Sequence, residues 1–181
     1  MSLRIYILGS LYYRELHPYE IKKKIMEATD NKMNITDGNL YYNFEALLKK
    51  DYIRKSETVQ SENRPEKTTY RITEAGQEAL KEGIYAAFKN PKSIESLFAP
   101  MLFIELVDIQ RLIFFIQEII TELEKDIEQY DDKSVNYSKR VHEAIQTEKG
   151  QYARFIVDHV WNRKKLELDS FTKLLNILKN S

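Results

Sequence analysis

Apolar and polar positions follow a helical pattern over residues 35–53. Leu40, Phe44, Leu47 and Leu48 fall at i, i+4, i+7 and i+8, so one face of the predicted helix is apolar. The opposite face is mostly polar and carries groups that can meet phosphates or base edges. Its residues are Asn39, Tyr42, Asn43, Ala46, Lys49 and Lys50. The pattern predicts a helix that enters the major groove of DNA.

The start of this helix carries several candidate DNA-binding residues. Thr36 is a predicted N-cap, whose hydroxyl accepts a hydrogen bond from a free backbone N–H of the first turn. Gly38 either eases the tight start of the helix or lets the backbone approach a phosphate. Asn39 and Asn43 are candidates for groove contact, because an asparagine amide can pair with adenine through both of its polar atoms. Tyr41 either packs against the preceding helix or contacts DNA.

Two strand-like runs follow, over residues 52–59 and 68–72, and both are rich in aromatic and β-branched side chains. The polar segment 60–67 lies between them and predicts the tip of a β-hairpin. Arg64 and Lys67 belong to this tip and are predicted to contact phosphates or the minor groove. A helix followed by such a hairpin is typical of a winged helix.

The elements on either side complete that arrangement. Residues 3–13 are mostly apolar and predict a buried first helix, in which Gly9 permits the close approach of another helix. Pro18 suits the first position of the second helix, where its missing N–H does no harm. Lys22 lies on this second helix, either as a phosphate contact or as plain solvated surface. Thr73 is a predicted N-cap of the helix after the hairpin.

The pattern changes after residue 87. Residues 88–93 predict a linker, and residues 94–105 predict an apolar helical face interrupted by a proline. A long helix is predicted over residues 109–130, followed by a polar loop over residues 131–138. A final helix is predicted over residues 151–180, while the pattern over the intervening 12 residues is weak. The predicted domains are therefore a winged helix-turn-helix at residues 1–88 and a helical dimerisation domain at residues 89–181.

The two long helices have apolar stripes that one helical pair cannot fully bury, so a second copy is the expected partner. The alternative is that the stripes only close an intramolecular core. Phe115, Phe155 and Trp161 are candidate ligand-binding residues, because their rings could line a flat pocket near the dimer seam. The alternative is again that these rings are core.

The composition of the chain bears on which classes of function are expected. The 28 basic and 28 acidic residues cancel, which is unusual for a nucleic-acid binder, although residues 49–71 hold seven basic and four acidic side chains. The chain has no cysteine and three widely spaced histidines, so neither a metal site nor a cofactor is predicted. No catalytic motif is present, and an enzyme is not expected. No apolar run approaches the ~18 residues that cross a bilayer, and a cytoplasmic location is expected.

The motifs resemble those of the PadR-type transcriptional regulators over roughly the first 80 residues. Their order and spacing are those of that family. They are Ile7-Leu8-Gly9, His17-Pro18-Tyr19-Glu20-Ile21, Gly38-Asn39-Leu40-Tyr41, Asn63-Arg64-Pro65 and Tyr70-Arg71-Ile72-Thr73-Glu74-Ala75-Gly76. Pro18 stands where a glycine is usual, and Tyr42 where a proline is common, which alters what the recognition helix touches.

The resemblance implies a homodimer, joined through the C-terminal helices, that binds double-stranded DNA at a palindromic operator. It also implies a repressor that a small aromatic or hydrophobic effector releases. Two other hypotheses remain open: a winged-helix adaptor that binds proteins and not DNA, and a small-molecule carrier. The carrier would leave Asn39, Asn43, Arg64 and Lys67 without a role.

Overall fold

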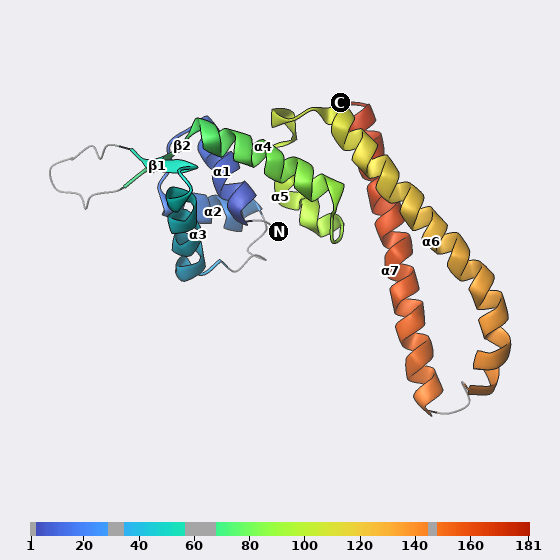
Figure 1. Cartoon of the computed structure of the whole chain (residues 1–181). Coiled ribbons are helices and arrows are strands. Elements are labelled where there is room, and N and C mark those ends of the chain that lie inside the picture. The colour runs from blue at the N-terminus through green and yellow to red at the C-terminus, as the bar shows by residue number, and fades with distance from the viewer. Residues whose placement is uncertain (1–2, 29–34, 57–67, 145–147) are drawn as a thin grey trace. The chain divides into compact units, whose positions relative to one another are not determined.

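The computed structural model describes the backbone of residues 3–28, 35–56, 68–144 and 148–181, with side chains described except over residues 130–149. Figure 1 labels the α-helices and the two strands, and the described residues form eleven elements. They are α1 (Leu3–Tyr13), α2 (Pro18–Ala28), α3 (Asp37–Lys49), β1 (Ile53–Lys55), β2 (Tyr70–Ile72), α4 (Glu74–Lys89), η1 (Ile94–Leu97), α5 (Phe98–Met101), η2 (Ile104–Leu106), α6 (Ile109–Ala144) and α7 (Glu148–Lys179). The chain divides into two compact units, residues 1–107 and residues 108–181. This is the predicted fold class: mainly α, with a two-stranded β-wing.

Helix α1 is the centre of unit 1, where it contacts α2, α3, α4, α5 and β2. Ile7 and Leu8 are almost completely buried, as the apolar run at residues 3–13 predicts. A Cβ atom on Gly9 would lie 2.5 Å from the ring carbons of Phe103. The close approach at Gly9 is therefore to a ring from the segment after α5, whereas the sequence predicted the approach of another helix.

The helix-turn-helix consists of α2 and α3. The predicted N-cap is confirmed, because the Asn39 backbone N–H donates to Thr36 Oγ1 over 3.3 Å. Leu40, Phe44 and Leu47 bury the inner face of α3, and only 1–2% of each residue is exposed. The apolar stripe at helical spacing thus fixes which side of α3 faces the core and which side remains on the surface.

The wing strands pair antiparallel, with Ile53 opposite Ile72 and Lys55 opposite Tyr70. They are shorter than the predicted runs, and the predicted tip at residues 60–67 lies outside the described residues. Leu16 adds an isolated bridge on the other edge of β2, where it exchanges two backbone hydrogen bonds of 3.0 and 3.2 Å with Tyr70. The wing is therefore anchored to the segment between α1 and α2.

The turn between α3 and β1 lies tightly against the start of α4. Asp51 has a positive φ of 53°, and its carbonyl oxygen accepts a 2.6 Å hydrogen bond from the Thr73 hydroxyl. The same Thr73 oxygen accepts from the Gly76 backbone N–H, which confirms the predicted N-cap of α4. A Cβ atom on Gly76 would lie 2.0 Å from the Tyr52 carbonyl oxygen, so only glycine fits here.

The segment after α4 belongs to unit 1. Its three short helices, η1, α5 and η2, interrupt the predicted apolar face. Helix η1 contacts α4, and α5 contacts both α1 and α4. Tyr13 at the end of α1 donates a short hydrogen bond to Glu105. The compact units consequently divide between residues 107 and 108, whereas the sequence places the domain boundary between residues 88 and 89. The sequence pattern did not reveal that this short segment packs back onto α1.

Unit 2 is a hairpin of α6 and α7, joined by an ion pair of 2.5 Å between Asp126 and Lys164. The prediction of a loop over residues 131–138 is wrong, because α6 continues as a helix through Ala144. No glycine or proline occurs between residues 109 and 149 to end the helix, and a polar helix needs no apolar stripe where it leaves the core. Leu112, Ile116, Phe171, Leu174 and Leu178 are buried in the chain.

No helix within the described residues is both long and apolar enough to span a bilayer.

Candidate nucleic-acid interface

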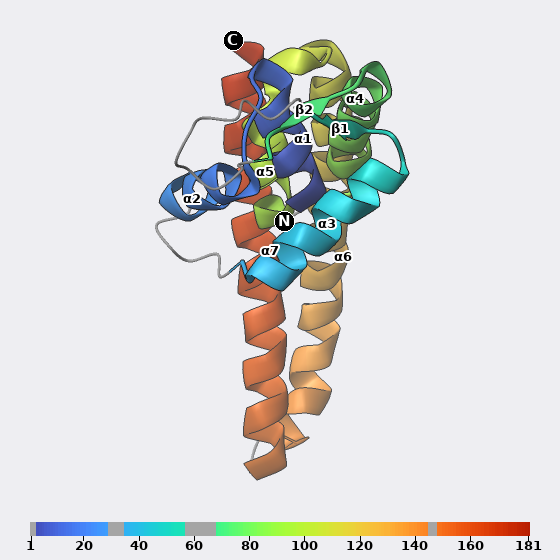
Figure 2. The ribbon, with the colours of Figure 1, turned by 90° about the vertical axis from the view of Figure 1, so that its left-hand side faces the viewer.

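The outer face of α3 lies on the surface of unit 1. Figure 2 shows this helix toward the viewer, with the β1 and β2 strands above it. Tyr42 is 71% exposed and Tyr41 48% exposed, while Asn39 is exposed and Asn43 partly buried. Tyr41 thus lies partly exposed on the surface of α3. Asn39, Tyr42 and Asn43 lie within a sector of about 100° on this helix, whereas Tyr41 lies on its other flank.

The two asparagines are joined to each other by hydrogen bonds. The Asn43 Nδ2 group donates to the Asn39 backbone oxygen over 2.8 Å and to Asn39 Oδ1 over 3.0 Å. The Asn43 amide nitrogen is therefore engaged with Asn39, and Asn43 Oδ1 remains as an acceptor. Asn39 Nδ2 remains as a donor, so the pair together offers the donor and the acceptor that adenine or a G·C pair needs.

The remaining predicted residues of the helix start differ in role. Thr36 uses its hydroxyl to cap α3, so it positions the helix. A Cβ atom on Gly38 would meet nothing within 4 Å, so the packing of the chain does not require glycine at this position. Lys22 is 22% exposed in its side chain and forms an ion pair with Asp37, 2.6 Å between Nζ and Oδ1.

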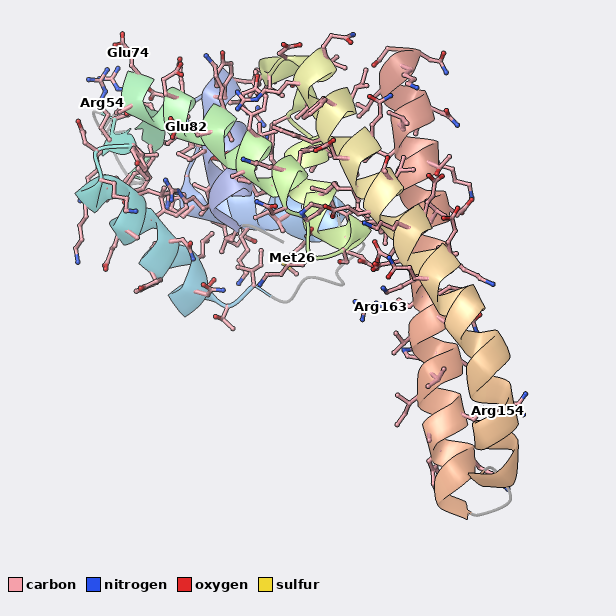
Figure 3. All side chains as sticks on the ribbon, turned by 45° about the vertical axis from the view of Figure 1, so that its right-hand side comes forward. Met26, Arg54, Glu74, Glu82, Arg154 and Arg163 are labelled. Atoms are coloured by element: carbon pink, nitrogen blue, oxygen red, sulfur yellow. The ribbon has the colours of Figure 1, made fainter. Side chains whose placement is uncertain are left out.

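Arg64 and Lys67 of the predicted wing tip lie outside the described residues. The wing strands instead provide cationic residues that the sequence pattern did not single out. Arg54 lies directly opposite Arg71 in the strand register, and both side chains are exposed. Neither arginine forms an ion pair with any other residue that the structure describes. Figure 3 shows Arg54 directed away from the ribbon.

Like charges directly opposite each other destabilise an antiparallel pair. An anionic partner such as a phosphate would offset that repulsion, and arginine binds phosphate well because its guanidinium offers several donors in one plane. The signal in the sequence was the single arginine in each strand. Recognising the pair required the register, which residues 52–59 and 68–72 alone do not fix.

Tyr70 connects the wing to α3. Its ring packs edge-on against Phe44 with 4.9 Å between centroids. Burial raises the pKa of the Tyr70 hydroxyl above its ordinary value, and the charges of Tyr41 and Glu45 raise it further. The contact of Tyr70 with Phe44 fixes the wing against α3, while Arg71 and the opposed Arg54 lie on the other face of the two-stranded sheet from Tyr70.

The candidate ligand-binding residues do not lie together within one hairpin. The ion pair of Asp126 with Lys164 sets the register of α6 against α7. Phe115 and Trp161 are therefore separated by roughly 20 Å along the hairpin, at 1.5 Å per residue. Phe155 is 70% exposed and stacks on His159, and the Lys165 ammonium lies 5.1 Å from the centre of the Trp161 ring. One copy does not bring Phe115 to the other two rings.

Among the described residues, no cluster of three or more histidine, aspartate or glutamate side chains is placed to hold a metal ion.

Comparison with known proteins supports the motif assignment. A sequence model of the transcriptional regulator PadR-like family matches residues 7–82, from α1 through the wing into α4. The chain belongs to the PadR-like family. Members of this family are transcriptional regulators and not enzymes. A search of curated proteins finds no match.

Solved structures of PadR-like and related regulators are similar to this chain. A transcriptional regulator from Clostridium thermocellum is 31% identical, covers 45% of this chain and 77% of its own, and has a TM-score of 0.41. A PadR-like transcription factor from Bacteroides fragilis is 25% identical over 46% and 78% of the two chains, with a TM-score of 0.42. Bacillus subtilis PadR, solved in complex with operator DNA, is 17% identical over 97% and 98%, with a TM-score of 0.44.

Proposed function

We propose that this PadR-like regulator binds double-stranded DNA in a sequence-specific manner through α3 and the wing. Asn39, Tyr42 and Asn43 meet base edges in the major groove, while Arg54 and Arg71 bind phosphates. Gly38 and Tyr41 belong to the same surface, and Thr36 sets the start of the helix. The observation that carries the proposal is the exposed polar face of α3, together with two opposed arginines on the wing strands that lack an ion-pair partner among the described residues.

The direct test is fluorescence anisotropy of a labelled duplex from the region upstream of the protein's own gene, with a scrambled duplex of equal length as control. We expect tighter binding of the upstream duplex and a loss of affinity as salt rises, because bound phosphates release counterions. Equal, salt-insensitive signals from both duplexes would contradict DNA binding. Equal but salt-sensitive binding would contradict only this choice of operator.

We further propose that the protein acts as a homodimer through α7. Tyr152, Phe155, Leu166 and Ile177 lie within a sector of about 60° on this helix, and 63–71% of each residue is exposed. Such a row of apolar side chains along a helix is what a second copy would cover. A two-fold dimer would present two copies of α3 to a palindromic operator, with half-sites about one helical turn apart.

Repression is the proposed mode of action, because a dimer bound at a promoter blocks polymerase by occupancy alone. A small aromatic or hydrophobic effector would release the DNA if it binds the DNA-incompetent arrangement more tightly. Phe155 and Trp161 are the residues we propose for this ligand, and Phe115 would join them only from a second copy. We propose a cytoplasmic location, where the DNA is.

The balanced charge of the chain favours a second candidate, a winged-helix adaptor that binds a protein. The two functions differ in their dependence on ionic strength. DNA binding weakens steeply as salt rises, whereas an apolar protein interface does not.

A further inference from the structure

An ion pair between the two helices of the helix-turn-helix lies at the start of α3. Lys22 Nζ on α2 is 2.6 Å from Asp37 Oδ1, and Asp37 is the first residue of α3. The Lys22 side chain is 22% exposed, while that of Asp37 is 73% exposed. The carboxylate is thus on the surface at the end of α3 that also carries Gly38 and Asn39.

This placement changes what that end of α3 attracts. The N-terminus of a helix carries a partial positive charge, which stabilises a nearby anion. A phosphate is one such anion, but here the Asp37 carboxylate already lies in the first turn. The same carboxylate neutralises Lys22, the cation that the sequence suggested as a phosphate contact. Arg54 and Arg71, in contrast, form no ion pair among the described residues.

We propose that Asp37 and Lys22 form a neutral pair that positions α3 and keeps its N-terminal end from binding phosphate. Phosphate contacts then come from the wing strands, and the start of α3 is left to uncharged groups. The empty space around Gly38 agrees with this, since its backbone can approach a base edge closely. Lys22 and Asp37 are positioning residues, and the inference rests on the proposed DNA binding.

The test removes the two charges singly and together and measures binding of each variant to a random-sequence duplex of about 20 base pairs, which is long enough to offer several phosphates. Anisotropy titrations across a salt series compare the full-length protein with Asp37→Asn, Lys22→Ala and the double variant. Asp37→Asn releases the Lys22 ammonium, so binding tightens about tenfold at low salt and the salt slope steepens by about 0.9. Lys22→Ala leaves a lone carboxylate, so binding weakens and the slope becomes shallower by a similar amount.

The double variant decides between the two roles of Lys22. If the pair is neutral in the wild type, removing both charges returns the affinity to within about twofold of wild type, with an unchanged slope. If Lys22 contacts a phosphate directly, the double variant still binds more weakly than wild type with a shallower salt slope, and the inference is overturned. A merely structural role would not move the salt slope, and circular dichroism checks that each variant keeps its helix content.

Lys23→Ala is the matched control on the same helix. Lys23 is 67% exposed, and its nearest carboxylate is that of Glu27 at 3.8 Å. We expect its slope to remain within about 0.3 of wild type, since one bound phosphate contributes about 0.9. A change as large as that of Lys22→Ala would show a general charge effect and overturn the inference. Wild type that binds no duplex in a salt-sensitive way would instead refute the proposed DNA binding itself.

Discussion

Individual residues of α3 and the turn after it combine recognition with tight packing. On the outer face, the Asn43 amide nitrogen donates to the backbone oxygen and to Oδ1 of Asn39, which leaves Asn39 Nδ2 as a donor and Asn43 Oδ1 as an acceptor. In the turn, the start of α4 comes so close to the Tyr52 carbonyl that Gly76 has no room for a side chain. Changes on the outer face should therefore alter binding, and changes in the turn should alter folding.

Replacing Asn39 and Tyr42 together with alanine should weaken operator binding and leave folding intact. Both side chains are exposed on α3, and a good base contact contributes about 1–3 kcal/mol of discrimination, or roughly 5- to 150-fold in affinity. Anisotropy titration measures the loss, with sedimentation and circular dichroism as folding controls. Asn90→Ala, an exposed asparagine at the end of α4, is the matched control and should bind as wild type. Full-strength binding by the double variant would refute the recognition-helix assignment.

Gly76→Ala should destabilise the protein by about 1–3 kcal/mol, because the new methyl group would overlap a backbone carbonyl. Thermal unfolding followed by circular dichroism measures the change. Gly38→Ala is the same substitution in open space and should be neutral or slightly stabilising. Equal melting temperatures for the two variants would contradict the packing of α4 against the α3–β1 turn.

Among the elements, α7 differs from the rest in the apolar surface it leaves exposed. Its buried residues Phe171, Leu174 and Leu178 lie near the end that pairs with the start of α6. The row that contains Phe155 and Leu166 is exposed in one copy. Leu174→Asp is consequently a poor test of dimerisation, since it would place a charge in the core of the chain.

Leu166→Asp should separate the proposed dimer without unfolding the hairpin, because 63% of Leu166 is exposed in one copy. Sedimentation should shift from twice the chain mass of 21.5 kDa to a single mass. Thr172→Asp introduces the same charge on a different face of α7 and should remain dimeric. A monomeric wild type, or a Leu166→Asp variant that stays dimeric, would contradict the proposed interface.

For the molecule as a whole, the zero net charge means that DNA attraction comes from local groups. Unit 1 holds the recognition helix and the wing, and unit 2 holds the apolar row and the single tryptophan. An effector that binds near Trp161 in unit 2 would therefore alter DNA binding by changing the arrangement of the two units. Coupling of this kind requires different affinities for the two arrangements of the protein.

Trp161 makes that coupling measurable. A planar phenolic acid such as a hydroxycinnamate, if it binds beside this ring, should quench the tryptophan emission and lower the anisotropy of the protein–DNA complex over the same concentrations. Phe155→Ala should weaken both responses, whereas Phe114→Ala, an exposed ring on α6, should alter neither. Release of DNA without quenching would place the effector elsewhere.

Local features of the fold follow from the amino-acid sequence alone. Thr36 and Thr73 cap α3 and α4 as predicted, the apolar stripe of α3 faces the core, and the order of the motifs indicates the PadR-like family. These features depend on residues close together in the chain, and helical spacing, capping and turn chemistry are local effects. The loop predicted at residues 131–138 failed because a polar segment without glycine or proline is equally suited to a solvated helix.

Contacts between residues far apart in the sequence, in contrast, are determined by the tertiary fold. Strand register places Arg54 opposite Arg71, the contact of α2 with α3 pairs Lys22 with Asp37, and the hairpin register separates Phe115 from Trp161. Residues 94–106 likewise join unit 1 through contacts with α1 and α4. Each of these depends on packing between elements far apart in sequence, for which residue periodicity carries no information.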